Sequence, residues 1–123
     1  MTTYFGFAIA DSMFPAACTV TRAPLTIDEV RAQIADCVPC LNPSHAATIE
    51  AAKLRFNLDV TIPSSAPKVA LDAGDAIIVM GVRGLPRLDA TRHEYTEAEI
   101  SSATFDFAQW RVRTDLELSY NHM

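Results

Sequence analysis

The residues best suited to chemistry lie in the segment 41–56, LNPSHAATIEAAKLRF, where a predicted helix carries a histidine in its first turn. Asn42 can cap this helix and Pro43 can take its first position, because proline lacks an N–H and its φ is already helical. His45 then falls near the third helical position, with Thr48 projecting from the same side. The N–H groups and dipole of a helix start favour a phosphate, to which a histidine could donate a proton. A surface or partly buried structural histidine is the alternative.

Two arginines form a second group, in the segment 74–89, GDAIIVMGVRGLPRLD. Here an apolar strand is predicted to run out into a tight loop that holds Arg83 and Arg87. The planar guanidinium suits phosphate or carboxylate, and the neighbouring glycines let a ligand approach the backbone. Neither of the glycine patterns typical of phosphate-binding loops, G-x-x-x-x-G-K and G-x-G-x-x-G, is present. The alternative is that the arginines pair with acidic residues nearby in the sequence, which are Asp72, Asp75 and Asp89.

The segment CVPCLNPSH could suggest a metal or redox site built from Cys37, Cys40 and His45. A structural zinc usually needs four ligands, and the remaining cysteine and histidines have no paired spacing. They are Cys18, His93 and His122. The C-x-x-C pair also straddles a predicted helix end rather than beginning a helix after a strand, as redox pairs do. We therefore expect reduced, small buried thiols, with no metal and no cofactor.

A third possibility is the adjacent pair His93 and Glu94 in RHEYTEAE, followed by Tyr95. Adjacent side chains diverge in both helices and strands, so a solvated loop is the favoured interpretation over an acid/base pair. The sequence contains no G-x-S-x-G elbow, no H-E-x-x-H motif and no paired catalytic carboxylates. The sequence therefore argues against the commonest types of hydrolase active site.

Alternating helices and strands must position these groups. Capping-box spacing between Thr26 and Glu29 predicts a helix over 26–37, and the same spacing between Thr96 and Glu99 predicts another at 96–101. The strands are predicted at 3–10, 18–21, 59–63, on both sides of a turn at Ala73 and Gly74 within 68–84, and at 104–112. This order predicts a small α/β or α+β domain, with a mixed sheet of about five strands flanked by helices.

Composition limits the class of protein. The 123 residues suit one domain, predicted over 1–113 with a flexible tail over 114–123. The formal net charge of −5 argues against a DNA-coating or polybasic membrane role. The apolar opening YFGFAIA lacks a basic leader region, and no run approaches the length of a membrane span, so we expect a cytoplasmic protein.

The order of short motifs resembles a family of small viral and phage proteins, some of which are ring nucleases that act as anti-CRISPR agents by destroying cyclic oligoadenylate messengers. SHAATI matches the family's H-x-x-T-I pattern at a helix start. ALDAGDAIIVM is similar to its E-x-x-D strand, RLD stands where the family tends to have R-L-E, and TEAEI precedes an aromatic strand. The resemblance covers most of the chain from Tyr4 to Val112.

The resemblance implies roles for particular residues. His45 corresponds to the family's catalytic histidine and Thr48 to its partner in the motif. Arg87 corresponds to a basic residue that contacts the ligand. The acidic helper falls on Asp89, one methylene shorter than in the family. The N-terminal loop departs from the family, because FAIADS keeps only Asp11 and Ser12 as polar residues, and the arginine loop is two residues longer. The expected ligand-binding residues are Asp11, Ser12, Ser44, Thr48, Arg83 and Arg87.

The implied activity is metal-independent cleavage of a cyclic oligoribonucleotide by its own 2′-hydroxyl, with His45 as general acid. A ring ligand with pseudo-twofold symmetry is most naturally bound across a twofold interface, so we expect a homodimer, and no duplex nucleic acid or membrane partner. Two alternatives remain. One is a non-catalytic protein that sequesters a nucleotide signal, and the other is a protein-interaction module that inhibits a host enzyme through its acidic surface.

Overall fold

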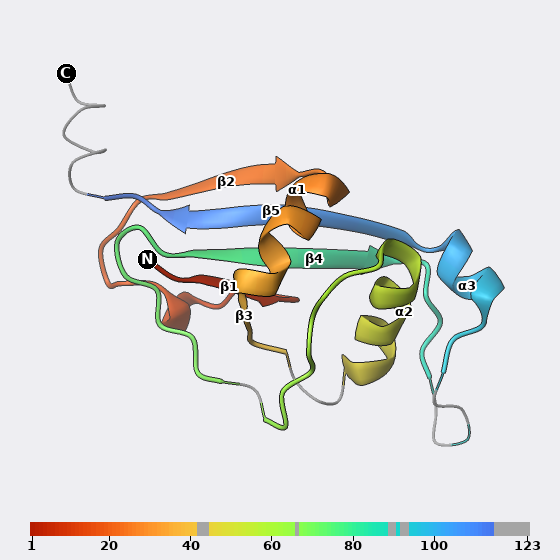
Figure 1. Ribbon diagram of the computed structural model, residues 1–123. Coiled ribbons are helices and arrows are strands. Elements are labelled where there is room, and N and C mark those ends of the chain that lie inside the picture. Colours follow the sequence, from red (N-terminus) through yellow and green to blue (C-terminus); the bar gives the residue numbers. More distant parts are fainter. Residues whose placement is uncertain (42–44, 66, 89–90, 92–93, 115–123) are drawn as a thin grey trace.

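The computed structural model describes residues 1–41, 45–65, 67–88, 91 and 94–114, which form a mixed five-stranded sheet with helices (Figure 1). The strands are β1 (Thr3–Gly6), β2 (Val20–Leu25), β3 (Val38–Pro39), β4 (Ala76–Arg83) and β5 (Thr104–Val112), in the order β2-β5-β4-β1-β3. β1 is parallel to β3 and β4, whereas β5 is antiparallel to β4 and β2. The predicted α+β class, with a mixed sheet of five strands, is confirmed.

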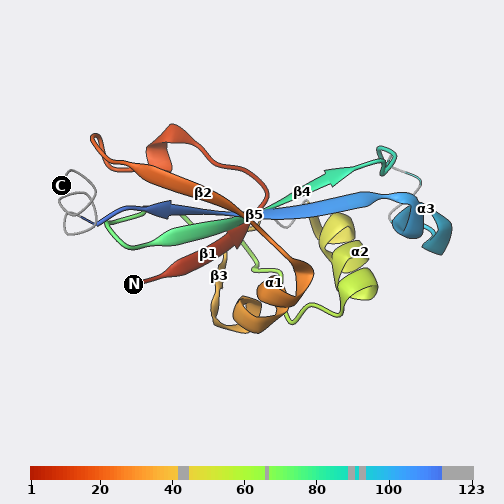
Figure 2. The same ribbon diagram turned by 90° about the horizontal axis from the view of Figure 1, so that it is seen from above.

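The α-helices are α1 (Ile27–Gln33), α2 (Ala46–Phe56) and α3 (Glu97–Ser102), and two 3-10 turns are η1 (Asp11–Met13) and η2 (Ile34–Asp36). α1 and α2 lie on the same face of the sheet, whereas η1 lies on the other face, and α3 lies beside the beginning of β5 (Figure 2). The two longer α-helices, α1 and α2, therefore cover one face of the sheet.

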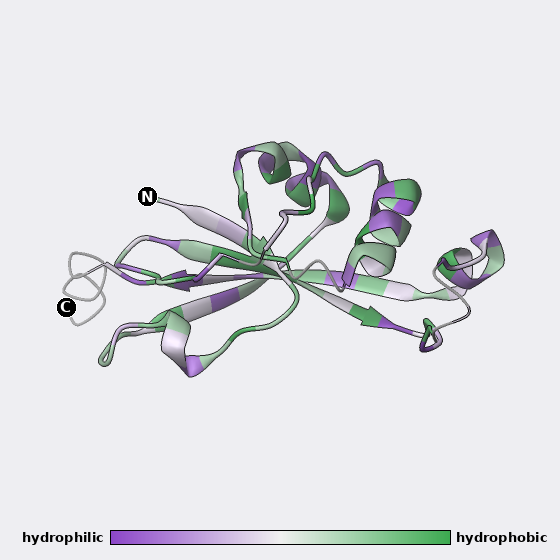
Figure 3. Cartoon of the chain, turned by 90° about the horizontal axis from the view of Figure 1, so that it is seen from below, coloured by the Kyte–Doolittle hydropathy of each residue, from purple (hydrophilic) through white to green (hydrophobic). Residues whose placement is uncertain are grey.

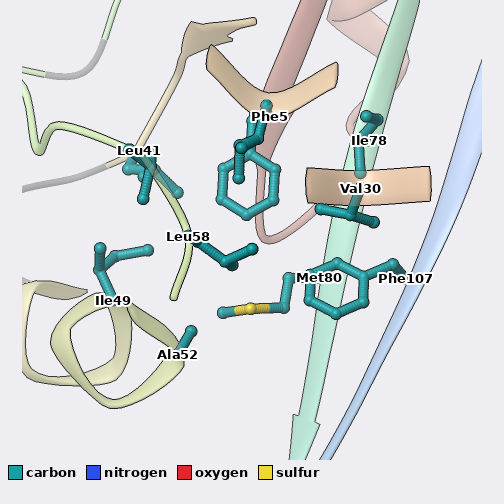
Figure 4. Close-up of a cluster of buried hydrophobic side chains, with 11 residues drawn as sticks. Phe5, Val30, Leu41, Ile49, Ala52, Leu58, Ile78, Met80 and Phe107 are labelled. Atoms are coloured by element: carbon teal, nitrogen blue, oxygen red, sulfur yellow. The ribbon is translucent and has the colours of Figure 1, made fainter. Parts of the chain in front are cut away.

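The larger core fills the space between the sheet and its two helices (Figure 4). Residues two apart on a strand share a face, so Ile78 and Met80 of β4 point into this core together. They meet Val30 of α1 and Ile49 of α2, each at most 1% exposed. The remaining buried members of this core are Phe5, Ile34, Leu41, Ala52, Leu58, Val60 and Phe107.

A smaller core covers the opposite face. Ile77 and Val112 supply its strand residues, and Val69 and Leu71 from the connection before β4 cover them. Met13 and Phe14, at and after η1, pack against this cluster. Hydrophobic and hydrophilic residues alternate along α1 and α2, as expected for helices with one face on a core (Figure 3).

The predictions of a strand at 59–63 and of another before the turn at 73–74 are wrong, since the described residues there form no strand. The connection between α2 and β4 instead places individual side chains in the two cores, with Val60 in the larger core and Leu71 in the smaller one. The Leu71 N–H donates to the Met13 carbonyl. Pro63 and Pro67 offer no N–H to a strand partner, which explains why apolar patterning alone predicted too much sheet here. The strand predicted at 3–10 is shorter, ending at Gly6.

The helix carrying His45 begins later than the sequence predicts. α2 begins at Ala46, and His45 is its N-cap, with φ −95° and ψ 15°, rather than its third residue. Asn42 and Pro43, the predicted cap and first position, lie outside the described residues. The ring of His45 packs against the ring of Phe7. The two residues are far apart in the sequence, so the capping pattern around His45 could not predict this contact.

Candidate functional site

The candidate site is centred on His45 at the start of α2. Its exposed ring lies 5.1 Å, centroid to centroid, from the half-buried ring of Phe7, tilted by 49°. Phe7 directly follows β1, so the contact joins the carboxyl end of β1 to the N-terminus of α2. This arrangement leaves the imidazole accessible to solvent while one aromatic neighbour restricts its orientation.

The first turn of α2 contains no carboxylate, and among the described residues no side chain caps it through a hydrogen bond. The other two α-helices differ. In α1 the side chains of Thr26 and Glu29 form a complete capping box, and Thr96 and Glu99 do the same in α3. Because a first turn without a carboxylate keeps the partial positive charge of its N–H groups, the start of α2, as far as its described residues show, has the electrostatics that favour an anion.

Burial below the first turn holds this helix start in place. Ile49, one turn into α2, is 1% exposed and packs in the same core as Leu41, which lies just before the helix (Figure 4). Thr48 lies in the first turn and is half-buried. Lys53 and Arg55 lie in the last turn, where cations complement the opposite end of the helix dipole.

The two arginines predicted to bind the ligand lie near the end of β4: Arg83 is its last residue, and Arg87 follows it. Arg83 forms an ion pair with Asp106 of β5, with Nη2 3.1 Å from Oδ2. This is the structural role considered as the alternative, with a partner that was not among the predicted acids. The sequence could not supply that partner, because the pairing depends on the antiparallel register of β4 and β5. Arg87 is exposed in the connection between β4 and α3.

The structure does not bring Asp11 and Ser12 together with His45. Both lie in η1, and the residues at and after this turn pack on the face of the sheet opposite α2 (Figure 2). Ser44, Asp89 and His93 lie outside the described residues. Of the predicted site, the described residues therefore place His45 and Thr48 in adjacent positions and Asp11 and Ser12 elsewhere.

The cysteines differ in burial: Cys18 is exposed, whereas Cys37 and Cys40 are half-buried. Cys37 contacts the helix-side core, whereas Cys40 contacts the opposite core, so the two thiols lie on different faces and form no disulfide. Burial raises the pKa of both thiols, which disfavours the reactive thiolate. Their sulfurs donate to the carbonyls of Gln33 and Phe5. Within the described part of the chain, no group of three or more cysteine, histidine or acidic residues could hold a metal.

Phe7 is the site residue that sequence reasoning missed. Its signal was present, as an aromatic residue directly after the first strand, but the segment FAIADS drew attention only to its polar positions. Phe7 lies directly after β1, where it is half-buried, packs against the edge of the larger core and contacts the ring of His45.

No family model and no curated protein matches this sequence. Among solved structures, the chain is similar to B116 of Sulfolobus turreted icosahedral virus, with a TM-score of 0.64 and 15% sequence identity. The match covers 90% of this chain and 99% of that chain. The two proteins therefore share a fold over almost their whole lengths, and this fold occurs in a viral protein. In the described residues, no helix is long and apolar enough to cross a membrane.

Proposed function

We propose that this protein is a ring nuclease that binds a cyclic oligoribonucleotide at the start of α2 and cleaves it without a metal ion. The observation that carries the proposal is the position of His45. Its ring is exposed, supported by Phe7, and placed at a helix start with no carboxylate in its first turn. An anion and a proton donor can therefore meet at one point.

The chemistry follows from the substrate. The 2′-oxygen of the ribose attacks the adjacent phosphorus and its proton passes to water, while the bond from phosphorus to the 5′-oxygen breaks. His45, as the imidazolium, donates a proton to that leaving oxygen. The N–H groups of the first turn of α2 stabilise the charge that develops on the phosphoryl oxygens. The products are a 2′,3′-cyclic phosphate and a 5′-hydroxyl.

Other parts of the proposal rest on the sequence resemblance and on the viral occurrence of the fold. Arg87 contacts a phosphate of the ligand and Asp89 assists His45. The ligand is cyclic oligoadenylate, bound across a twofold homodimer in the cytoplasm, and the protein acts as a viral anti-CRISPR agent. Light scattering after size-exclusion chromatography at micromolar concentration should therefore return a dimer, and a monomer would remove the twofold site.

The decisive experiment incubates the pure protein with a panel of cyclic oligoribonucleotides and identifies products by mass spectrometry. We expect a linear product ending in a 2′,3′-cyclic phosphate, formed equally well with EDTA. A 2′-deoxy analogue should stay intact because it lacks the nucleophile. Cleavage of the deoxy analogue, or inhibition by EDTA, would contradict the mechanism. Arg87→Ala should weaken both binding and rate, because its charge meets the phosphate in both the ground and transition states.

A non-catalytic nucleotide-binding protein is the second candidate. It is favoured by the placement of Asp11 and Ser12 on the other face of the sheet and by the ion pair that occupies Arg83, because both leave fewer groups to assist His45. The same panel separates the two candidates. This one requires saturable binding of a cyclic oligonucleotide with no product after long incubation.

A further inference from the structure

A pocket lies where β5 ends and β2 begins. These strand ends are at the other end of the sheet from α2 and α3 (Figure 1). The pocket volume is about 340 Å³, and its described lining residues are Thr21, Ala23, Gln109, Arg111 and Arg113. We propose that this pocket binds the dianionic phosphate group of a small phosphomonoester. The proposed site is independent of His45 and of the proposed cleavage.

The strand register explains why the two arginines share this pocket. Thr21 pairs with Arg111 across the antiparallel β2 and β5, and Ala23 pairs with Gln109. Side chains two residues apart on a strand point to the same face, so Arg111 and Arg113 both project toward the face that α1 covers farther along. Ala23, opposite Gln109, lines the pocket beside Thr21 with a small side chain.

Hydrogen bonds within the fold orient both guanidinium groups. Arg111 Nη1 donates to the Gly74 carbonyl at 2.8 Å, and Arg113 Nη1 donates to Thr21 Oγ1 at 2.9 Å. Among the described residues no carboxylate forms an ion pair with Arg111, unlike Arg31 and Arg83, which pair with aspartates. The positive charge of Arg111 is therefore oriented by the fold without being neutralised by a described carboxylate.

The remaining donors complete a phosphate site. Because the Thr21 oxygen accepts from Arg113, its own hydroxyl hydrogen can be donated to a ligand, and the Gln109 side chain offers amide hydrogens. Guanidinium groups bind phosphate through two parallel N–H donors. Both guanidinium groups line the pocket, and a phosphomonoester dianion offers their N–H donors more negative charge than a carboxylate or a phosphodiester, each of which carries a single charge.

Pocket size and net charge favour a small ligand over a polymer. A volume of about 340 Å³ lies in the range typical of small-molecule sites. The chain carries a formal net charge of −5, which repels an extended polyanion approaching the whole surface. A single phosphate group can instead enter a local positive pocket.

Glucose 6-phosphate and dimethyl phosphate are the matched probes, since one carries a dianionic monoester and the other a monoanionic diester. Each is titrated into the full chain, with the Arg111 side-chain N–H and the Thr21 amide resonances followed by NMR. We expect saturable binding of glucose 6-phosphate with a Kd of about 1 mM or tighter, and dimethyl phosphate at least tenfold weaker. Inorganic phosphate should displace the sugar phosphate, because the phosphate group is what is recognised.

Arg111→Gln should weaken binding roughly tenfold or more by removing a charged donor. Arg22→Gln is the control, because Arg22 follows the pocket residue Thr21 on β2 but lies over the ring of Trp110 rather than lining the pocket. It should change the Kd less than twofold. Gln109→Glu keeps every arginine and adds a repelling carboxylate, so it tests the proposal even if Arg111→Gln unfolds. The proposal is overturned if the two phosphates bind equally, if inorganic phosphate does not compete, or if the pocket variants bind like the control.

Discussion

The first turns of α1 and α2 lie on the same face of the sheet but treat their unpaired N–H groups differently (Figure 2). At α1, Thr26 Oγ1 accepts from the Glu29 N–H at 3.2 Å, and Glu29 Oε1 accepts from the Thr26 N–H at 2.9 Å. At α2, the N-cap is His45, with no side-chain capping bond among the described residues and no acid in the first turn. The start of α1 is thus neutralised by its own side chains, whereas no described side chain does so at α2.

This difference separates a structural helix start from one that can accept a ligand. A capping-box glutamate occupies the position where an external anion would bind and cancels part of the helix dipole. The chain uses that box at α1 and again at α3 but places a histidine on the longest of the three α-helices. The missing capping stabilisation at α2 is consistent with a helix start kept for binding.

The largest effect should follow His45→Ala. If the imidazolium protonates the leaving oxygen, the single-turnover cleavage rate falls by roughly 10²-fold or more, while the Kd for the cyclic substrate changes little. Removing the same ring from a purely structural position would leave the rate unchanged. Quenched single-turnover assays at saturating protein measure the rate, and a binding titration measures the Kd. An unchanged rate would mean that His45 has only a structural role.

A smaller effect should follow from making α2 resemble α1. Ala47→Glu places a carboxylate in the first turn of α2, which should weaken binding of the anionic ligand roughly tenfold and stabilise the fold by up to about 1 kcal/mol. Ala47→Gln is the control, because it has the same size without the charge. Titration calorimetry and thermal unfolding give the two quantities, and equal affinities for the two variants would mean that no anion binds at this turn.

Local signals predicted the parts of the fold that are stabilised locally. Thr26 with Glu29 and Thr96 with Glu99 identified α1 and α3, and both capping boxes form completely. The apolar strand β4 was predicted to be central, and it lies in the middle of the sheet order. The connection before β4 was overpredicted because its apolar residues bury one at a time in two different cores, a pattern that resembles strand alternation.

The candidate site was less predictable because it depends on contacts between distant segments. The sequence identified His45 and the helix that carries it, but not the ring of Phe7 beside it. It associated Asp11 with the site, whereas the turn that holds Asp11 packs on the other face of the sheet. The ion pair of Arg83 with Asp106 likewise requires the register of two strands.

The closed start of α1 should contribute to stability and not to ligand binding. Thr26→Ala removes the side-chain acceptor of the Glu29 N–H and should lower the free energy of unfolding by about 1 kcal/mol. The affinity for the cyclic ligand should stay the same, since this helix start carries no proposed site. Urea denaturation measures the first quantity and a binding titration the second. A loss of affinity comparable to that in Ala47→Glu would remove the distinction between the two helix starts.

The smallest effect is the pH dependence of the α1 cap. The backbone N–H of Thr26, and secondarily its side chain, lower the pKa of Glu29 below the ordinary value of 4.5. A carboxyl whose pKa is depressed in the folded state stabilises the fold above its unfolded pKa and loses this contribution as pH falls through the folded value. NMR titration of the Glu29 carboxyl carbon should show the lowered midpoint. Thr26→Ala keeps the backbone N–H and should move the midpoint back only by the smaller, side-chain part. If Glu29 titrates normally in the unmodified protein, the capping box does not hold its carboxylate in solution.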